Sequence, residues 1–323
     1  MRPAGRGVVL GALLLTAAAA GQEAVAQEDL ELDLFRPRLE ITGERVPQRE
    51  FTDIPGDFFS QRSLDLKLNV PLGSTHFHPG KAILGHQIFA QVQMKSSPTD
   101  ISFLDRDLDL YSGAARVTGL MLSRTGNLYI ASLGASFAED DQTIDNLDPR
   151  FAGVGIGTYR KNEELTFIYG GIVSYAYGRR LTIPMFGLVW RYRPKWSLFT
   201  VVPFVVKTTY RRSDKLSLNF NLAVSGDRHR FANEGDFPGE PETIFLRVVQ
   251  SRLGAELEYR PNRDHAFLGE VGVLSNRRLE FSRTSEIDDT ILEADIEPSG
   301  YLRLAWRYSF GKSLLDKAGE AKP

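Results

Sequence analysis

The sequence predicts an all-β protein, a transmembrane antiparallel β-barrel of about 12 strands with 10–14 possible. Three observations predict it. The chain starts with an export signal, most of the remainder alternates apolar and polar residues, and no segment could be a membrane helix. The longest stretches without Asp, Glu, Lys or Arg are Thr125–Ala138 and Leu165–Gly178, each of 14 residues. A spanning helix needs about 18 or more.

The composition excludes several classes of protein. The chain has 323 residues, no cysteine and a formal net charge of −2. Without cysteine there is no disulfide, thiolate nucleophile or cysteine-ligated metal. Because the chain has no excess of basic residues, no nucleic-acid partner is predicted. No cofactor is predicted either.

The first 26 residues have the three parts of a secretory signal peptide. Arg2 and Arg6 form a positive start, Val8–Ala20 is apolar, and Ala24-Val25-Ala26 is a cleavage site before Gln27. We expect residues 27–62 to form an irregular periplasmic or plug segment, because prolines interrupt them. The barrel is assigned to 63–310 and a periplasmic tail to 311–323.

Period-two alternation defines the strands. In Leu216–Ser225, leucine, phenylalanine and valine alternate with serine, asparagine and alanine. Successive side chains of a strand point to opposite faces, so such a strand has one apolar and one polar side. Tyr301–Phe310 and Val249–Tyr259 repeat the pattern. The predicted strands are 63–72, 81–95, 108–123, 127–138, 150–160, 164–178, 182–193, 197–211, 214–226, 244–260, 265–281 and 298–310.

Strand length favours a membrane barrel over a soluble sandwich. Most segments have ten residues or more, whereas strands of globular proteins most often have about 5–6 and tilted membrane strands about 9–11. Aromatic residues also lie near the predicted strand ends, where an interfacial girdle belongs. The candidate interfacial aromatics are Tyr159, Tyr192, Trp196, Tyr210, Tyr259, Trp306 and Phe310.

An even strand count places both ends of the barrel in the periplasm. Residues 227–243 and 282–297 are then outer loops, and 211–214 and 260–264 are inner turns. The N-terminal half fits less well, because 139–149 and 96–107 would be long on the inner side. We therefore expect a miscounted strand there.

Two resemblances extend this interpretation. The final strand Tyr301–Phe310, which ends on an aromatic residue, resembles the assembly signal of bacterial outer-membrane barrels, although Gly311–Pro323 follows it. This implies recognition by the outer-membrane insertion machinery. Leu68–Leu72, and Arg252–Tyr259 leading to Arg260-Pro261, resemble a family of uncharacterised bacterial outer-membrane β-barrel proteins. That resemblance implies the outer membrane of a Gram-negative bacterium, with its lipid as the neighbour, and no catalytic residues.

The polar face of the strands supplies the candidate lumen. Its candidate lining residues are Lys67, Gln91, Gln93, Arg191, Lys207, Asn219, Asn221, Arg252, Glu256, Glu258, Arg303 and Arg307. They predict a passive or weakly selective channel for small solutes. A sealed barrel with a structural or surface-binding role is the first alternative, and an outer-membrane hydrolase is the second.

Other chemistry has weaker support in the sequence. No catalytic, cofactor or metal residue is assigned, and we expect no enzyme. His229 lies two residues from Asp227 in an expected outer loop, where a carboxylate-oriented base is conceivable. His76 and His78 have a spacing that zinc could use but lack a third ligand nearby. The acidic residues of 284–297 lack an EF-hand pattern.

Overall fold

The computed structural model describes residues 36–311, apart from 74–75, 79, 105, 177–178 and 285–288, and of residues 175, 176, 179 and 180 it describes only the backbone. The predicted signal peptide and nearly all of the predicted tail lie outside this range. No helix in the described part is long and apolar enough to cross a membrane.

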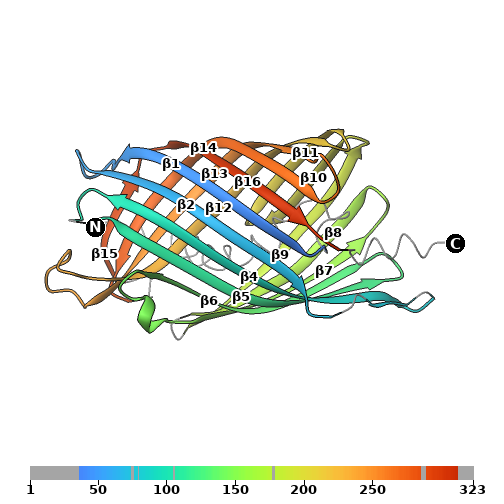
Figure 1. Ribbon diagram of the computed structural model, residues 1–323, viewed down its shortest axis with the longest axis horizontal. Coiled ribbons are helices and arrows are strands. Elements are labelled where there is room, and N and C mark those ends of the chain that lie inside the picture. Colours follow the sequence, from blue (N-terminus) through green and yellow to red (C-terminus); the bar gives the residue numbers. More distant parts are fainter. Residues whose placement is uncertain are drawn as a thin grey trace, which may run out of the picture.

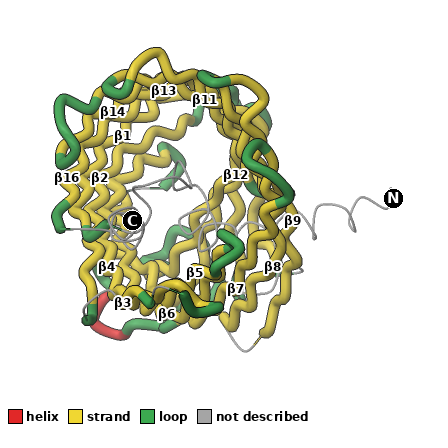
Figure 2. The backbone as a smooth tube through the Cα atoms, turned by 90° about the vertical axis from the view of Figure 1, so that its right-hand side faces the viewer, coloured by secondary structure: helices red, strands yellow, loops and turns green. Residues whose placement is uncertain are grey.

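In the described part of the chain, fourteen strands form a closed antiparallel ring (Figures 1 and 2). They are β1 (Arg38–Glu50), β2 (Phe58–Pro71), β4 (Ile83–Ile101), β5 (Leu108–Ser123), β6 (Leu128–Asp140), β7 (Arg150–Arg160), β8 (Leu165–Ala176), β9 (Arg179–Arg193), β10 (Trp196–Val202), β11 (Val205–Ser213), β12 (Leu216–Ala232), β13 (Thr243–Tyr259), β14 (His265–Ser282) and β16 (Ser299–Ser309). Short β3 (His76–Phe77) pairs with β4, and β15 (Thr290–Ile296) pairs with β14. The barrel fold is thus confirmed.

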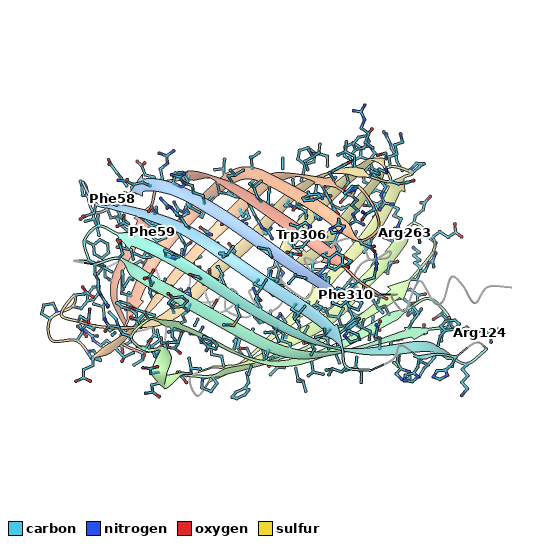
Figure 3. The ribbon with its side chains drawn as sticks, viewed as in Figure 1. Phe58, Phe59, Arg124, Arg263, Trp306 and Phe310 are labelled. Carbon is cyan, nitrogen blue, oxygen red and sulfur yellow. The ribbon has the colours of Figure 1, made fainter. Side chains whose placement is uncertain are left out.

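The ring closes between its first and last strands. β1 pairs antiparallel with β16, from Arg38 opposite Ser309 to Arg45 opposite Leu302. β1 therefore begins, and β16 finishes, at the same end of the barrel, which we call the turn end. We call the opposite end the loop end. Trp306 and Phe310 lie toward the turn end, and Phe58 and Phe59 toward the loop end (Figure 3).

Fourteen strands is the upper limit of the predicted range, and two corrections account for the increase. First, Arg38–Glu50 is a wall strand, although 27–62 was expected to be an irregular periplasmic or plug segment and no part of the wall. Its single proline within the strand, Pro47, lies at a register irregularity between Val46 and Arg49, where the ladder is already interrupted. Second, the predicted strand 197–211 is the hairpin of β10 and β11, which turns at Pro203.

The additional strand resolves the topological conflict. With β1 in the wall, the described residues of 102–107 and 141–149 connect strands at the loop end, as do 233–242, 283–284 and 289. The short turns 161–164, 194–195 and 214–215 lie at the turn end. The predicted loop 227–243 is also shorter than expected, because β12 continues to Ala232.

The outer face of the wall changes character along the barrel. Toward the turn end it exposes large apolar side chains such as Leu66, Leu133, Phe220 and Leu304. On a soluble protein a contiguous apolar belt of this size would be unusual, but it matches the lipid-facing band of a membrane barrel. Toward the loop end, charged pairs replace it, as where Arg278 meets Glu293 at 2.6 Å.

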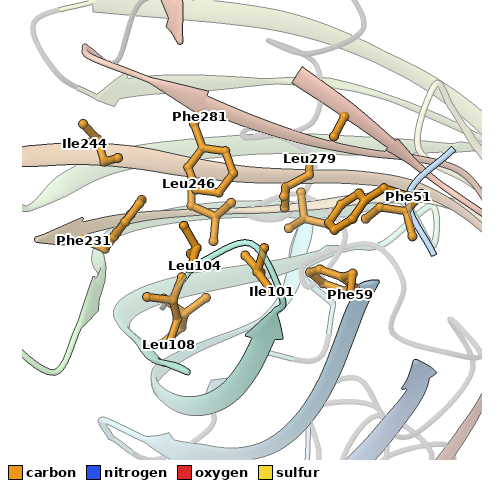
Figure 4. Close-up of a cluster of buried hydrophobic side chains, with 14 residues drawn as sticks. Phe51, Phe59, Ile101, Leu104, Leu108, Phe231, Ile244, Leu246, Leu279 and Phe281 are labelled. Carbon is orange, nitrogen blue, oxygen red and sulfur yellow. The ribbon is translucent and has the colours of Figure 1, made fainter. Parts of the chain in front are cut away.

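The inner face changes in the opposite sense. At the loop end, a cluster of buried apolar side chains fills the interior, and we call it the cap (Figure 4). Its members are Phe51, Phe59, Ile101, Leu104, Leu108, Leu110, Phe231, Ile244, Leu246, Val248, Leu279, Phe281, Ala294 and Ile296. The loop end is therefore built like a soluble β-barrel, apolar inside and charged outside. The apolar belt toward the turn end has apolar side chains outside and charged side chains inside.

Candidate functional site: the lumen

A central cavity of about 290 Å³ lies inside the barrel, below the cap. Its lining is rich in charged side chains of both signs. They are Arg38, Glu40, Glu44, Asp65, Lys67, Lys95, Lys207, Asp227, Arg252, Glu256, Glu270, Arg303 and Arg307. Acidic and basic groups are nearly equal in number, so the cavity has little net charge.

Most of these charges form close pairs. Arg307 Nε lies 3.0 Å from Glu40 Oε2, and Arg303 Nη1 lies 3.3 Å from Glu270 Oε2. The Tyr301 hydroxyl donates a 2.6 Å hydrogen bond to the second oxygen of Glu270, Oε1. A buried charge is tolerated when it is paired and hydrogen-bonded in this way. The lining is consequently a fixed network of dipoles and charges.

Two pairs join strands that are not neighbours in the ring. Lys95 of β4 contacts Asp227 of β12 at 2.5 Å, and Arg252 of β13 contacts Glu44 of β1 at 2.6 Å. β4 and β12 belong to opposite sides of the ring order. The Lys95–Asp227 pair is therefore a crossbar between opposite walls of the lumen.

Aromatic side chains of the cap and Phe103 lie close together at the loop end. Phe281 of β14 lies near Phe231 of β12, with ring centroids 5.7 Å apart, and near Phe103, at 5.9 Å. Phe103 in turn lies 5.3 Å from Phe51, which follows β1. The chain of rings runs from β12 past β14 to the end of β1, so aromatic side chains crowd this part of the loop end.

A second cavity, of about 350 Å³, lies at the turn end, and we call it the rim cavity. Glu163, Arg191 and Thr209 help to line it. Phe199 and Lys207 line both cavities. The two spaces therefore adjoin at these side chains, and the rim cavity is the one that lies at the turn end.

One side of the lumen wall is apolar on its inner face as well. Buried residues of β7–β11 form a second cluster, which includes Ile172, Ile183, Met185, Val201 and Phe204. The charged side chains come chiefly from β1, β2 and β12–β16. The lumen is thus amphipathic in cross-section, with a charged wall facing an apolar wall.

The sequence-derived candidates divide into three groups. Lys67, Lys207, Asn221, Arg252, Glu256, Arg303 and Arg307 line the central cavity, and Arg191 lines the rim cavity. Three others do not line a cavity but bind charged side chains. Asn219 donates to Glu256 at 2.8 Å, Gln93 donates to Asp65 at 3.1 Å, and Glu258 contacts Arg260. Gln91 lies on β4, half-buried and opposite Asn69.

Sequence reasoning missed the contribution of β1. Arg38, Glu40, Thr42 and Glu44 line the central cavity. A signal for them was present, because Leu39 and Ile41 alternate with these polar residues. Lys95 and Asp227 were also missed as a pair, since no local pattern brings together residues 132 positions apart.

The candidate aromatics gather at the turn end. Trp196 contacts Tyr210 at 4.8 Å between ring centroids and Tyr192 at 6.3 Å, and Trp306 lies 6.3 Å from Tyr308, which contacts Phe310. Tyr159 and Tyr259 lie exposed at the ends of β7 and β13. This arrangement is typical of an interfacial girdle.

The histidines lie differently from the expectations. His229 is not in an outer loop, because it is a buried residue of β12. Its Nε2 has no hydrogen-bond partner in the described part of the chain, so no Ser–His pair stands there. His76 faces His86 across β3 and β4, with ring centroids 4.9 Å apart and His78 nearby. No group of acidic or histidine side chains among the described residues has the geometry to hold a metal ion.

The closed ring, the apolar outer belt and the charged interior define a class: the protein is a β-barrel of the outer-membrane type. More particularly, the chain belongs to the family described as Domain of unknown function (DUF6268), whose model matches residues 127–308, more than half of the chain. The expected family of uncharacterised outer-membrane barrels is thereby confirmed. No curated protein matches the sequence.

Several solved outer-membrane proteins are similar in structure. An outer-membrane channel from Pseudomonas putida F1 is 7% identical with a TM-score of 0.47, over 88% of this chain and 100% of that one. The KdgM porin in complex with disordered oligogalacturonate is 8% identical with a TM-score of 0.32, over 84% and 99%. The translocator domain of the autotransporter NalP from Neisseria meningitidis is 12% identical with a TM-score of 0.35, over 91% and 97%. Likenesses at these TM-scores carry no argument about function.

Proposed function

We propose that the protein is an outer-membrane channel for small solutes whose lumen is largely occluded at rest. The single observation that carries the proposal is the pair of connected cavities, which share Phe199 and Lys207 and run from the turn end to the cap. A barrel that served only as a scaffold would not need an open, charge-lined interior. Among the described residues no catalytic constellation supports a hydrolase, and we propose no enzymatic activity and no cofactor.

The lining favours weak selectivity and small conductance. Acidic and basic groups alternate around the central cavity, so neither cations nor anions face a wall of one sign. Transverse pairs such as Lys95–Asp227 narrow the path. Barrels of about 16–18 strands leave a wide aqueous channel, whereas about eight are filled by side chains. Fourteen strands with paired charges lie between these limits.

Ion selectivity in planar bilayers tests the proposal. Lys207 lies at the junction of the two cavities, so Lys207→Glu adds negative charge on the path. We expect small steps from the wild type and a reversal potential shifted toward cations in Lys207→Glu. Lys215→Glu, on the exposed turn beside β12, is the matched control and is expected to leave selectivity unchanged. Absence of steps from folded protein, or an equal shift in both variants, would overturn the proposal.

A sealed barrel with a structural or surface-binding role is the second candidate. The cap favours it, because fourteen buried apolar residues fill the loop end. Folded wild-type protein that never conducts would support this candidate against the channel.

The remaining partners are inferred from the ends of the barrel. We propose that the signal peptide exports the chain, and that the outer-membrane insertion machinery recognises β16, the strand that closes the ring against β1. The termini then lie in the periplasm, the loop end faces outward, and outer-membrane lipid surrounds the belt. A Gram-negative host is implied.

A further inference from the structure

The barrel wall is incomplete near the loop end, between β9 and β12. In the described part of the chain, β9 pairs with β10 only as far as Phe186 opposite Val202, and β11 pairs with β12 only as far as Val205 opposite Ala223. Beyond these points β9 extends to Arg179 without a described partner on that side, and β12 next meets a strand there at Arg230. The hairpin of β10 and β11 ends at Pro203, whereas β12 continues for nine residues past Ala223.

The hairpin tip ends within the apolar band. Seven residues of β10, at about 3.3 Å each and tilted by about 40°, rise roughly 18 Å, less than the apolar band of about 25 Å. Val202 is 61% exposed on the outside of the tip, and no charged residue lies between Trp196 and Val206. On β12 the outward face passes from Val224 to Arg228 at this height. The gap therefore opens near the lipid head groups.

The wall closes again above the gap. β6 and β12, which are not neighbours in the lower ring, meet at Glu139 and Arg230 in a parallel bridge, with Arg230 Nε 2.6 Å from Glu139 Oε2. Arg150 joins the same two strands through hydrogen bonds to the carbonyl oxygens of Arg228, at 2.9 Å, and Ala138, at 3.4 Å. The gap is thus a framed window, with this bridge above it and the hairpin tip below it.

The central cavity reaches this window. Ala223, Ser225, Gly226 and Asp227 line the cavity and belong to the stretch of β12 where β11 stops. The backbone N–H of Val224 donates to the carbonyl oxygen of Phe204 at 3.2 Å, which places the hairpin tip directly beneath. The window therefore lies beside the part of the cavity wall that β12 forms.

The borders of the window are polar on β12 and apolar at the hairpin tip and β9. On the inner face of β12, the Ser225 hydroxyl oxygen and His229 Nε2 are buried, and neither has a hydrogen-bond partner in the part of the chain that the structure describes. A buried polar atom without a partner is costly, which suits a site that a polar ligand group visits. Below them lie the buried apolar side chains of Phe204, Ile183 and Met185.

We propose that the lumen opens sideways, through the window between β9 and β12, and that amphipathic molecules with a polar head and an apolar tail pass there. The head takes the unpartnered hydroxyl group of Ser225, and the tail lies against the apolar wall of Phe204. The inference rests on the proposed channel function for its transport role, but the window itself is a property of the wall.

Cysteine labelling tests the window directly, because the natural chain has no cysteine to give a background. Ser225→Cys places a thiol at the window, and Ala294→Cys places one inside the cap. A polyethylene-glycol maleimide too large to traverse the lumen is applied from the loop end. We expect Ser225→Cys to react at least tenfold faster than Ala294→Cys. Lys215→Cys, at the turn end, reports any reagent that has crossed.

Two further readouts separate this inference from the channel proposal. Equal or faster labelling of Ala294→Cys would overturn the window whether or not the protein conducts. Absence of conductance with rapid labelling of Ser225→Cys would overturn the channel and leave the window. Dodecanoate is the ligand probe, with sucrose as its control. Dodecanoate is expected to slow Ser225→Cys labelling several-fold, and equal protection by sucrose would overturn the amphipathic ligand class.

Discussion

At the scale of single residues, close strand contacts require glycine at particular wall positions. A Cβ built on Gly187 of β9 would overlap the carbonyl oxygen of Thr200 on β10 and lie 3.0 Å from the Thr200 carbonyl carbon. These are backbone atoms, so no side-chain rotation can relieve the clash. By contrast, no atom lies within 4 Å of a Cβ on Gly155 of β7.

Gly187→Ala is therefore expected to destabilise the barrel. Overpacking that forces backbone shifts costs about 1–3 kcal/mol. Urea unfolding in lipid vesicles, followed by the fluorescence of the three tryptophans, measures the loss. Gly155→Ala is the matched control and should unfold with the wild type. Equal stability of the two variants would contradict the close approach of β9 and β10.

At the scale of elements, charged pairs connect the loops at the loop end. Arg283, which follows β14, donates hydrogen bonds to both carboxylate oxygens of Glu240, and Nη2 lies 2.7 Å from Oε1. Arg283 also contacts Asp289 at 2.9 Å. These hydrogen bonds lower the pKa of Glu240 below its ordinary value. The carboxylate therefore binds the guanidinium more strongly than the neutral acid does.

The lowered pKa of Glu240 sets the direction of a pH effect. A depressed carboxyl pKa contributes stability that is present above the ordinary value of 4.5 and is lost as the pH falls through the folded value. We expect amide exchange in 233–242, corrected for its intrinsic pH dependence, to rise as the pH falls below 4.5.

An arginine variant checks the source of that effect. Arg283→Gln should raise exchange at neutral pH and abolish its acid dependence, whereas Arg212→Gln, exposed near the end of β11 at the turn end, should do neither. Unchanged acid dependence in Arg283→Gln would show that another group is responsible.

At the scale of the whole molecule, polarity inverts along the barrel axis. Around the belt, apolar side chains face outward and charges face the cavity. At the loop end the cap is inside, and pairs such as Arg278 with Glu293 are outside. Each zone presents outward the side chains that its surroundings solvate, apolar ones toward hydrocarbon and charged ones toward water.

This inversion predicts that the cost of introducing a charge on the outer face depends on its position along the barrel axis. Leu253 is 59% exposed on the belt, so Leu253→Arg should lower the free energy of unfolding in lipid by about 2–4 kcal/mol. Gln48→Arg, on the exposed loop-end part of β1, should change it by less than about 0.5 kcal/mol. Equal tolerance at the two positions would mean that the belt does not face lipid.

Local alternation predicted most of the wall, because the period of a strand is a property of neighbouring residues. It identified which face of Leu216–Ser225 is apolar and which residues of β13 and β16 point into the lumen. Alternation failed to predict the strands in two places, one where prolines interrupt it and one where a continuous apolar run replaces it. Residues 27–62, which contain β1, were set aside for their prolines, and Pro203 within an apolar run concealed a turn.

The sequence by itself determined that the chain forms a lipid-facing barrel, since alternation, strand length and end aromatics are all read within one strand. Only the tertiary structure decided what the interior contains. The cap, the Lys95–Asp227 crossbar and the meeting of β6 with β12 join residues that lie about a hundred positions apart or more. Such contacts depend on where the ring closes and how many strands it holds, and no local period encodes either.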